Sequence, residues 1–200
     1  MHADDVMEIL EASGAVRRGH FRLTSGLHSD LFLLCAQVTQ YPTHTTRLAE
    51  AMARPFADQG VEVVAGPAVG GIILAYEVAR VLSARAIFAE KTGAMTPGVE
   101  KGSLNVMTLR RGFSLQPGER VLVVEDALTT GGSIGNVIAA LRARGARVIG
   151  ASVLVDRSGG KTDLGIPLHA LLRLEVRAWD RSECPLCRER VPLIEPKEPA

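Results

Sequence analysis

The stretch from Glu119 to Gly145, ERVLVVEDALTTGGSIGNVIAALRARG, decides the fold. Its four consecutive apolar residues, Val121 to Val124, predict a strand that is buried on both faces. Apolar residues then recur at the i, i+3, i+4 and i+7 positions of one helix face, namely Ile134, Val137, Ile138 and Leu141. A buried strand, a short loop and an amphipathic helix form the repeating unit of α/β proteins.

The same alternation continues on both sides of this stretch. A helix beginning at Asp4 and a hairpin with its turn at Ser25–Gly26 open the chain, and a helix over 43–59 follows, shortened by Pro55. Further strands are predicted over 61–66, 84–90, 120–127, 146–157 and 167–176, with a helix beginning near Gly70. The segment from Lys91 to Asn105 is rich in glycine and has no apolar period, which predicts a long flexible loop. The fold class is therefore α/β, with a central, mostly parallel sheet flanked by helices.

Composition excludes several function classes. With 200 residues the chain suits one domain over 1–200, with a loose tail over 192–200. The formal net charge of +1 gives no global field for nucleic acid, so no nucleic-acid partner is expected. We expect no membrane contact and a cytoplasmic location, because no apolar run approaches the roughly 20 residues of a membrane span and the N-terminus is acidic.

The loop after the buried strand has the composition of a phosphate site. Gly131 and Gly132 permit backbone angles that turn successive N–H groups toward one point, at the start of a helix. Thr129, Thr130 and Ser133 add hydroxyl donors. The preceding carboxylates of Glu125 and Asp126 suit vicinal hydroxyls or a divalent metal, so the pair of sites describes a ribose 5-phosphate. The alternative is a tight strand–helix turn beside a solvated acidic pair. No G-x-x-x-x-G-K-[ST] pattern is present, which excludes a P-loop.

Three stretches carry a family resemblance. VLVVEDALTTGGS resembles the phosphoribosyl-pyrophosphate (PRPP) motif of the type I phosphoribosyltransferases, and HFRLTSGLHSD and VVAGPAVGGIILAYEVAR are similar to their orotate phosphoribosyltransferase branch. The resemblance covers nearly the whole chain. It implies the family fold, with a hood from residues 1–40 and the C-terminal segment, and transfer of ribose 5-phosphate from PRPP to N1 of orotate with Mg²⁺. This reaction belongs to pyrimidine biosynthesis.

The resemblance also implies roles for single residues. Glu125 and Asp126 would face the ribose hydroxyls, with Asp126 catalytic and both acids possible metal contacts through substrate or water. The PRPP-binding segment is completed by Ala127, Leu128, Thr129, Thr130, Gly131, Gly132 and Ser133. Arg157 would pair with the orotate carboxylate, since a planar fork of donors fits a carboxylate, and Thr129 and Phe32 would lie near the base. The alternatives are a surface salt bridge of Arg157 with Asp156 or Asp163 and a core position for Phe32.

The pyrophosphate and lid regions depart from the family pattern. The pyrophosphate loop is assigned to Pro67, Ala68, Val69 and Gly70 together with Thr24 and Ser25, with Gly70 and Thr24 standing where many relatives carry lysine. Lys91 aligns with a basic residue at the start of the lid and is assigned to catalysis and PRPP binding. Lys101 is the candidate catalytic cation of the lid, with Arg110 and Arg111 in reserve. The family pattern implies a homodimer whose lids are shared across the interface.

Histidines and cysteines give weaker signals. His28 could contact pyrophosphate, although histidines beside a turn, like His20 and His28, more often face solvent. Cys184 and Cys187 form a single C-x-x-C, and two chains of a dimer could supply four zinc ligands. A pair of structural thiols is the simpler interpretation.

Two other functions remain compatible with the motifs. One is a transferase of the same fold for another base, against which Arg157 and the hairpin argue. The other is a PRPP-binding regulator without catalysis, which would call for a basic face or an added DNA-binding unit.

Overall fold

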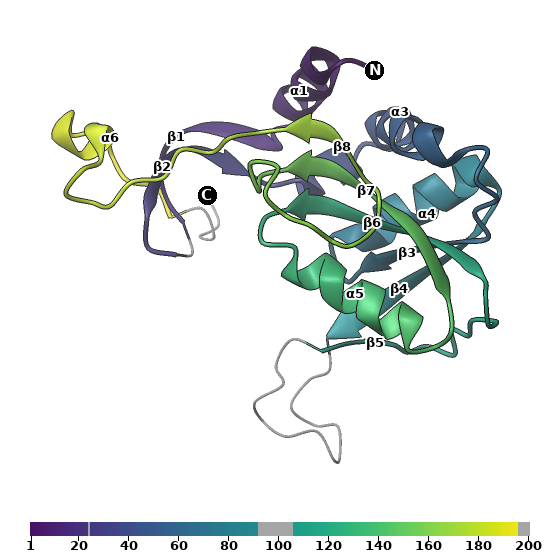
Figure 1. The fold of residues 1–200 in the computed structure, drawn as a ribbon. Coiled ribbons are helices and arrows are strands. Elements are labelled where there is room, and N and C mark those ends of the chain that lie inside the picture. Colours follow the sequence, from purple (N-terminus) through teal and green to yellow (C-terminus); the bar gives the residue numbers. More distant parts are fainter. Residues whose placement is uncertain (24, 92–105, 196–200) are drawn as a thin grey trace.

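The computed structural model describes residues 1–23, 25–91 and 106–195 (Figure 1). Along the chain these residues form α1 (Ala3–Ala12), β1 (Val16–Arg22), β2 (His28–Leu33), α2 (Ala36–Thr39), α3 (Pro42–Ala53), the 3-10 turn η1 (Arg54–Phe56), β3 (Val63–Pro67), α4 (Gly71–Leu82), β4 (Arg85–Lys91), β5 (Met107–Leu109), β6 (Arg120–Leu128), α5 (Gly132–Arg142), β7 (Arg147–Asp156), β8 (Leu168–Arg173) and α6 (Pro185–Arg188).

The main sheet has the strand order β5-β4-β3-β6-β7-β8. The pairs β4–β3, β3–β6, β6–β7 and β7–β8 are parallel, and β5 joins the edge antiparallel to β4. Parallel neighbours need crossover connections, which α4 supplies between β3 and β4 and α5 supplies between β6 and β7. The α/β class and the mostly parallel sheet are therefore confirmed.

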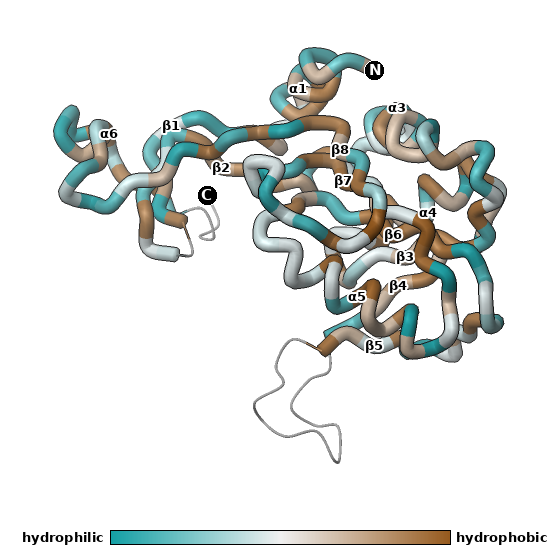
Figure 2. Tube along the Cα trace, viewed as in Figure 1, coloured by the Kyte–Doolittle hydropathy of each residue, from teal (hydrophilic) through white to brown (hydrophobic). Residues whose placement is uncertain are grey.

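Both faces of the sheet are buried, because successive residues of a strand point to opposite faces. Val64, Leu122 and Val124 belong to the core under α1, α3 and α4. Val63, Val121 and Val123 belong to the second core under α5, with Ile134, Val137, Ile138 and Leu141. Hydrophobic residues recur along β7 and α4 in Figure 2, as expected for elements inside such layers.

A second unit stands beside this layered body. β1 and β2 pair antiparallel, and the chain after β8 runs back along them to α6 (Figure 1). Its turn uses Gly26 at φ +85°, with the Gly26 N–H donating to the Leu23 carbonyl at 2.9 Å. The predicted hairpin is therefore confirmed, and we refer to β1, β2 and residues 174–195 as the hood.

Other boundaries differ from the sequence predictions in physically simple ways. α3 gives way to a 3-10 turn at Arg54, because Pro55 lacks the N–H that an α-helix needs. β6 extends to Leu128, one residue beyond the predicted strand over 120–127, and the two acids of the opening stretch lie within it as predicted. The short elements α2, β5 and α6 were not predicted, since three or four residues show no measurable period. Of the predicted lid, Lys91 ends β4 and residues 92–105 lie outside the described residues. In the part that the structure describes, no helix is long and apolar enough to cross a membrane.

Candidate active site

The carboxyl ends of β3, β4, β6 and β7 meet at one edge of the sheet. In register, Pro67 of β3 pairs with Ala89 of β4, and Leu128 of β6 pairs with Asp156 of β7. The segments that follow these strands therefore share a rim, the usual ligand site of a parallel α/β sheet.

Glu125 and Asp126 lie next to each other in β6, close to this rim. Glu125 is buried, and burial together with the neighbouring Asp126 raises its pKa to about 7 from an ordinary value of 4.5. Burial also raises the pKa of Asp126, although its Oδ1 accepts a hydrogen bond of 2.7 Å from the Ala127 N–H. Two carboxyl groups in a desolvated site are well suited to accept hydrogen bonds from a bound polyol. When the site is empty, their ionised forms are destabilised because burial removes them from water.

The loop after β6 ends in a glycine that no other residue could replace without rearrangement. Gly131 has φ +81°, and a Cβ built on it would lie 2.6 Å from Thr162 Cγ2. Gly131 is the N-cap residue of α5, so the N–H groups of the first turn point toward the loop. A small cavity is lined by the predicted PRPP-binding residues other than Asp126 and Lys91: Glu125, Ala127, Leu128, Thr129, Thr130, Gly131, Gly132 and Ser133. The structure thus brings this predicted set together around one space.

The predicted pyrophosphate loop approaches the same acids. Pro67 ends β3, the peptide bond between Ala68 and Val69 is cis, and Val69 is largely exposed. A Cβ on Gly70 would lie 2.5 Å from Asp126 Oδ2. Any side chain at position 70 would therefore require the Asp126 carboxylate to move.

Arg157 follows β7 on the neighbouring side of the rim. Its backbone N–H donates to the Leu128 carbonyl at 2.7 Å, which fixes it beside the end of β6. Its guanidinium is half-buried, burial lowers its pKa, and Nε is buried with no hydrogen-bond partner in the structure. In the described part of the chain, Asp156 pairs with Arg173 at 3.9 Å and not with Arg157, so the salt-bridge alternative with Asp156 is wrong.

The remaining candidate residues of the sequence analysis lie in different places. Lys91 lines a cavity next to the loop over 129–133, together with Met107, Thr130, Gly132, Ser133 and Asn136. Arg111 is engaged by Glu90, at 2.9 Å between Nη2 and Oε1. Lys101 and Thr24 lie outside the described residues. Asn136 was missed from sequence, although its position one helical turn after Gly132 places it on the loop side of α5.

Among the candidates in the hood, the two histidines differ from their predicted positions. Phe32 is partly buried and lies against Phe21, with ring centroids 5.7 Å apart, so part of its surface packs within the hood. His20 and His28 are 2% and 3% exposed, and their expected solvent-facing position is therefore wrong. Ser25 lies exposed on the hairpin turn.

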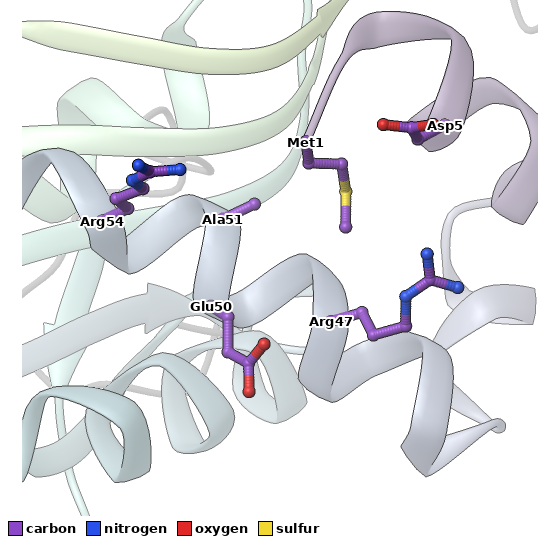
Figure 3. Close-up of a pocket in the computed structure, with 6 residues that line it drawn as sticks. All are labelled: Met1, Asp5, Arg47, Glu50, Ala51 and Arg54. Atoms are coloured by element: carbon purple, nitrogen blue, oxygen red, sulfur yellow. The ribbon is translucent and has the colours of Figure 1, made fainter.

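A separate pocket of about 420 Å³ lies between the N-terminus and α3 (Figure 3). Met1, Asp5, Arg47, Glu50, Ala51 and Arg54 line it. Its charged groups have both signs, and it shares no residue with the rim.

Comparisons with known proteins agree with this geometry. The family pattern described as "Phosphoribosyl transferase domain" matches residues 36–166. Orotate phosphoribosyltransferases of Caldanaerobacter subterraneus subsp. tengcongensis and Pelotomaculum thermopropionicum are 46% and 50% identical to the chain over 196 residues, covering 98% of this chain and 97% of each relative. The chain belongs to the orotate phosphoribosyltransferase family. Members of this family are enzymes of pyrimidine biosynthesis.

The fold agrees as well. The crystal structure of orotate phosphoribosyltransferase from Aeropyrum pernix aligns with a TM-score of 0.68 and 28% identity, over 84% of this chain and 93% of that one. An adenine phosphoribosyltransferase from Rhodothermus marinus aligns with a TM-score of 0.66 at 23% identity. That likeness reflects the shared fold alone and says nothing about the base.

Proposed function

We propose that this chain transfers the ribose 5-phosphate group of PRPP to N1 of orotate, forming orotidine 5′-monophosphate and releasing pyrophosphate. In this step the bond from C1′ to the pyrophosphate oxygen breaks, a bond from C1′ to N1 forms, and N1 of orotate loses its proton. Positive charge develops on the sugar and negative charge on the leaving group. The site must therefore present acceptors to the sugar and donors to both phosphate-bearing ends.

The residues of β6, the loop after it and the start of α5 offer such acceptors and donors. The carboxylates of Glu125 and Asp126 would accept hydrogen bonds from the ribose hydroxyls and stabilise the positive charge that develops at C1′. The N–H groups at the start of α5 and the hydroxyls of Thr129, Thr130 and Ser133 would hold the 5′-phosphate. The cavity lined by this loop supports the assignment.

The buried, unpartnered Nε of Arg157 is the structural observation that supports orotate as the base. A half-buried arginine whose Nε has no partner leaves a planar donor group unsatisfied, which is costly unless a ligand completes it. A carboxylate accepts two parallel N–H bonds from such a group. Orotate carries a carboxylate beside the nitrogen that reacts, whereas adenine, hypoxanthine and uracil do not. Phe32 and Thr129 would border the base.

Mg²⁺ fits the donor set of this rim. The carboxylates of Glu125 and Asp126 offer the oxygen ligands that Mg²⁺ prefers, in a place where burial makes their negative charge costly. They would hold the ion mainly through substrate hydroxyls or water. When bound, the ion would supply Lewis-acid neutralisation of the pyrophosphate. Lys91, which lines the neighbouring cavity with Thr130 and Ser133, would add a second positive charge near PRPP, and Lys101 remains the proposed lid cation.

We propose that residues 1–200 act as one domain in a homodimer, with the loop segments Pro67–Gly70 and 24–25 near pyrophosphate. An exposed apolar stripe supports self-association next to the site, because Val69, Ile73 and Tyr76 are 82%, 46% and 63% exposed. Its residues stand four and three positions apart, at the start of α4 and just before it. A sedimentation mass twice that of one chain is the expected result.

The deciding experiment follows orotate absorbance with purified protein, PRPP and Mg²⁺, and runs adenine, hypoxanthine and uracil as parallel bases. Loss of orotate that depends on PRPP, with no turnover of the other bases, is the expected outcome. Turnover of another base instead would assign a different transferase. Saturable PRPP binding without turnover of any base would favour the non-catalytic regulator.

A further inference from the structure

Two histidines of the hairpin and two cysteines of the C-terminal segment meet inside the hood. One ligand-type atom from each of His20, His28, Cys184 and Cys187 lies within 4.8 Å of the others. In the described residues this is the one group of three or more such side chains. The two pairs are about 160 residues apart in sequence, so only the folded chain brings them together.

The separations are close to those of a tetrahedral metal site, except that the two histidine nitrogens lie nearer to each other. His20 Nε2 lies 2.8 Å from His28 Nδ1, 3.5 Å from Cys184 Sγ and 3.7 Å from Cys187 Sγ. Cys187 Sγ lies 3.2 Å from His28 Nδ1. Tetrahedral zinc with Zn–N bonds of about 2.0 Å and Zn–S bonds of about 2.3 Å separates its ligand atoms by roughly 3.3 to 3.8 Å. Small side-chain movements would therefore complete the geometry.

The surroundings also have the features of a structural metal site. His20 Nδ1 lies 2.8 Å from the Val191 carbonyl, the kind of contact that fixes the tautomer and leaves Nε2 free to bind a metal. Three of the four side chains are buried, and Cys187 is partly buried. Cys184 and Cys187 flank the start of α6, whose Arg188 N–H donates to the Cys184 carbonyl at 3.3 Å. We propose that His20, His28, Cys184 and Cys187 together bind one structural Zn²⁺ per chain.

A bound metal ion would stabilise the hood. A two-stranded hairpin is marginally stable on its own, and small units with little core are often held by a metal. Backbone hydrogen bonds from His28 N–H to Trp179 at 2.8 Å and from Ile194 N–H to His20 at 2.8 Å already bring the C-terminal segment to the hairpin. The metal would fasten the same two segments through their side chains. It would thereby fix the hairpin turn that carries Ser25.

From the sequence, the single C-x-x-C could form a zinc site only by joining the cysteines of two chains. The proposed site instead takes all four ligands from one chain. It also has a metal-free competitor, in which His28 Nδ1–H donates directly to His20 Nε2 and both cysteines remain thiols. A third possibility is a disulfide between Cys184 and Cys187. These three alternatives differ in metal content, stoichiometry and mass.

The test measures zinc by mass spectrometry in full-length protein purified from zinc-containing medium without chelators. The expected result is one Zn²⁺ per chain in the unchanged protein and in the control Cys35→Ala, whose thiol is buried outside the cluster. The double variant Cys184→Ser/Cys187→Ser should retain less than about a tenth of the metal. His28→Asn should lower metal affinity at least tenfold, as expected when one of four ligands is lost.

A second measurement does not depend on the variants folding. Unchanged protein is stripped with chelator under reducing conditions and titrated with Co²⁺, whose tetrahedral thiolate complexes absorb in the near ultraviolet and visible. Absorbance that saturates at one Co²⁺ per chain, and disappears on addition of Zn²⁺, supports the proposal. Absence of both zinc and cobalt absorbance, half an equivalent per chain, or a Cys184–Cys187 disulfide in the freshly purified protein would each overturn it.

Discussion

Glu125→Gln should make the unliganded protein more stable at neutral and alkaline pH while lowering its activity. Burial and Asp126 raise the pKa of Glu125 from 4.5 to about 7, so the folded protein resists ionisation of this carboxyl group. Between these two values the folded state binds more protons than the unfolded state, and stability falls as pH rises. By linkage, ionisation of Glu125 lowers the free energy of unfolding by about 3 kcal/mol at pH 8 and by less than about 1 kcal/mol at pH 5. Glutamine keeps the shape and removes the charge.

The assay is urea denaturation of both proteins at several pH values from 5 to 8, without substrate or Mg²⁺. The difference in free energy of unfolding between the variant and the parent should grow by about 2 kcal/mol from pH 5 to pH 8. For a chain of this size, that corresponds to a Tm difference of roughly 4 to 8 °C. The matched control is Glu8→Gln, which removes an exposed carboxylate from α1 and should show no such trend. An advantage that does not change with pH, or a variant less stable than the parent at pH 8, would refute the reasoning.

Three further substitutions probe the rim. Arg157→Ala should raise the KM for orotate at least tenfold and change the KM for PRPP far less; equal losses for both substrates would move the carboxylate site elsewhere. Gly70→Ala should lower kcat/KM at least tenfold because its Cβ would lie 2.5 Å from Asp126 Oδ2, whereas Gly135→Ala, where a Cβ meets no heavy atom within 4 Å, should leave the kinetics nearly unchanged. Asp126→Asn should raise the PRPP requirement or abolish turnover without unfolding the protein, and an unchanged kcat/KM would count against its contact with ribose.

Much of the fold could be predicted because it follows from local periodicity. Val121 to Val124 read as a buried strand from their apolar run alone, and Ile134 to Leu141 read as a helix from their spacing. Alternation of such segments implies a parallel sheet, and a parallel sheet implies a rim at its carboxyl ends. The neighbouring positions of Glu125 and the 129–133 loop follow directly, since they are adjacent in the sequence.

Contacts between distant segments could not be predicted in this way. No local pattern shows that a side chain at position 70 would collide with Asp126, or that Arg157 Nε lacks a partner, because both depend on how β3, β6 and β7 lie side by side. β5 was missed because its strand character comes from pairing with β4 over three residues.

The hood shows most clearly the difference between what the sequence determines and what the tertiary structure determines. The sequence by itself determined an α/β sheet, a glycine-rich loop with the composition of a phosphate site, two acids beside it and a lone C-x-x-C. Only the tertiary structure decided that His20 and His28 turn inward to the two cysteines, because the side-chain direction of a short hairpin depends on which segment covers it. That covering segment is the far end of the chain, and residues so distant in sequence meet only when the whole fold has formed.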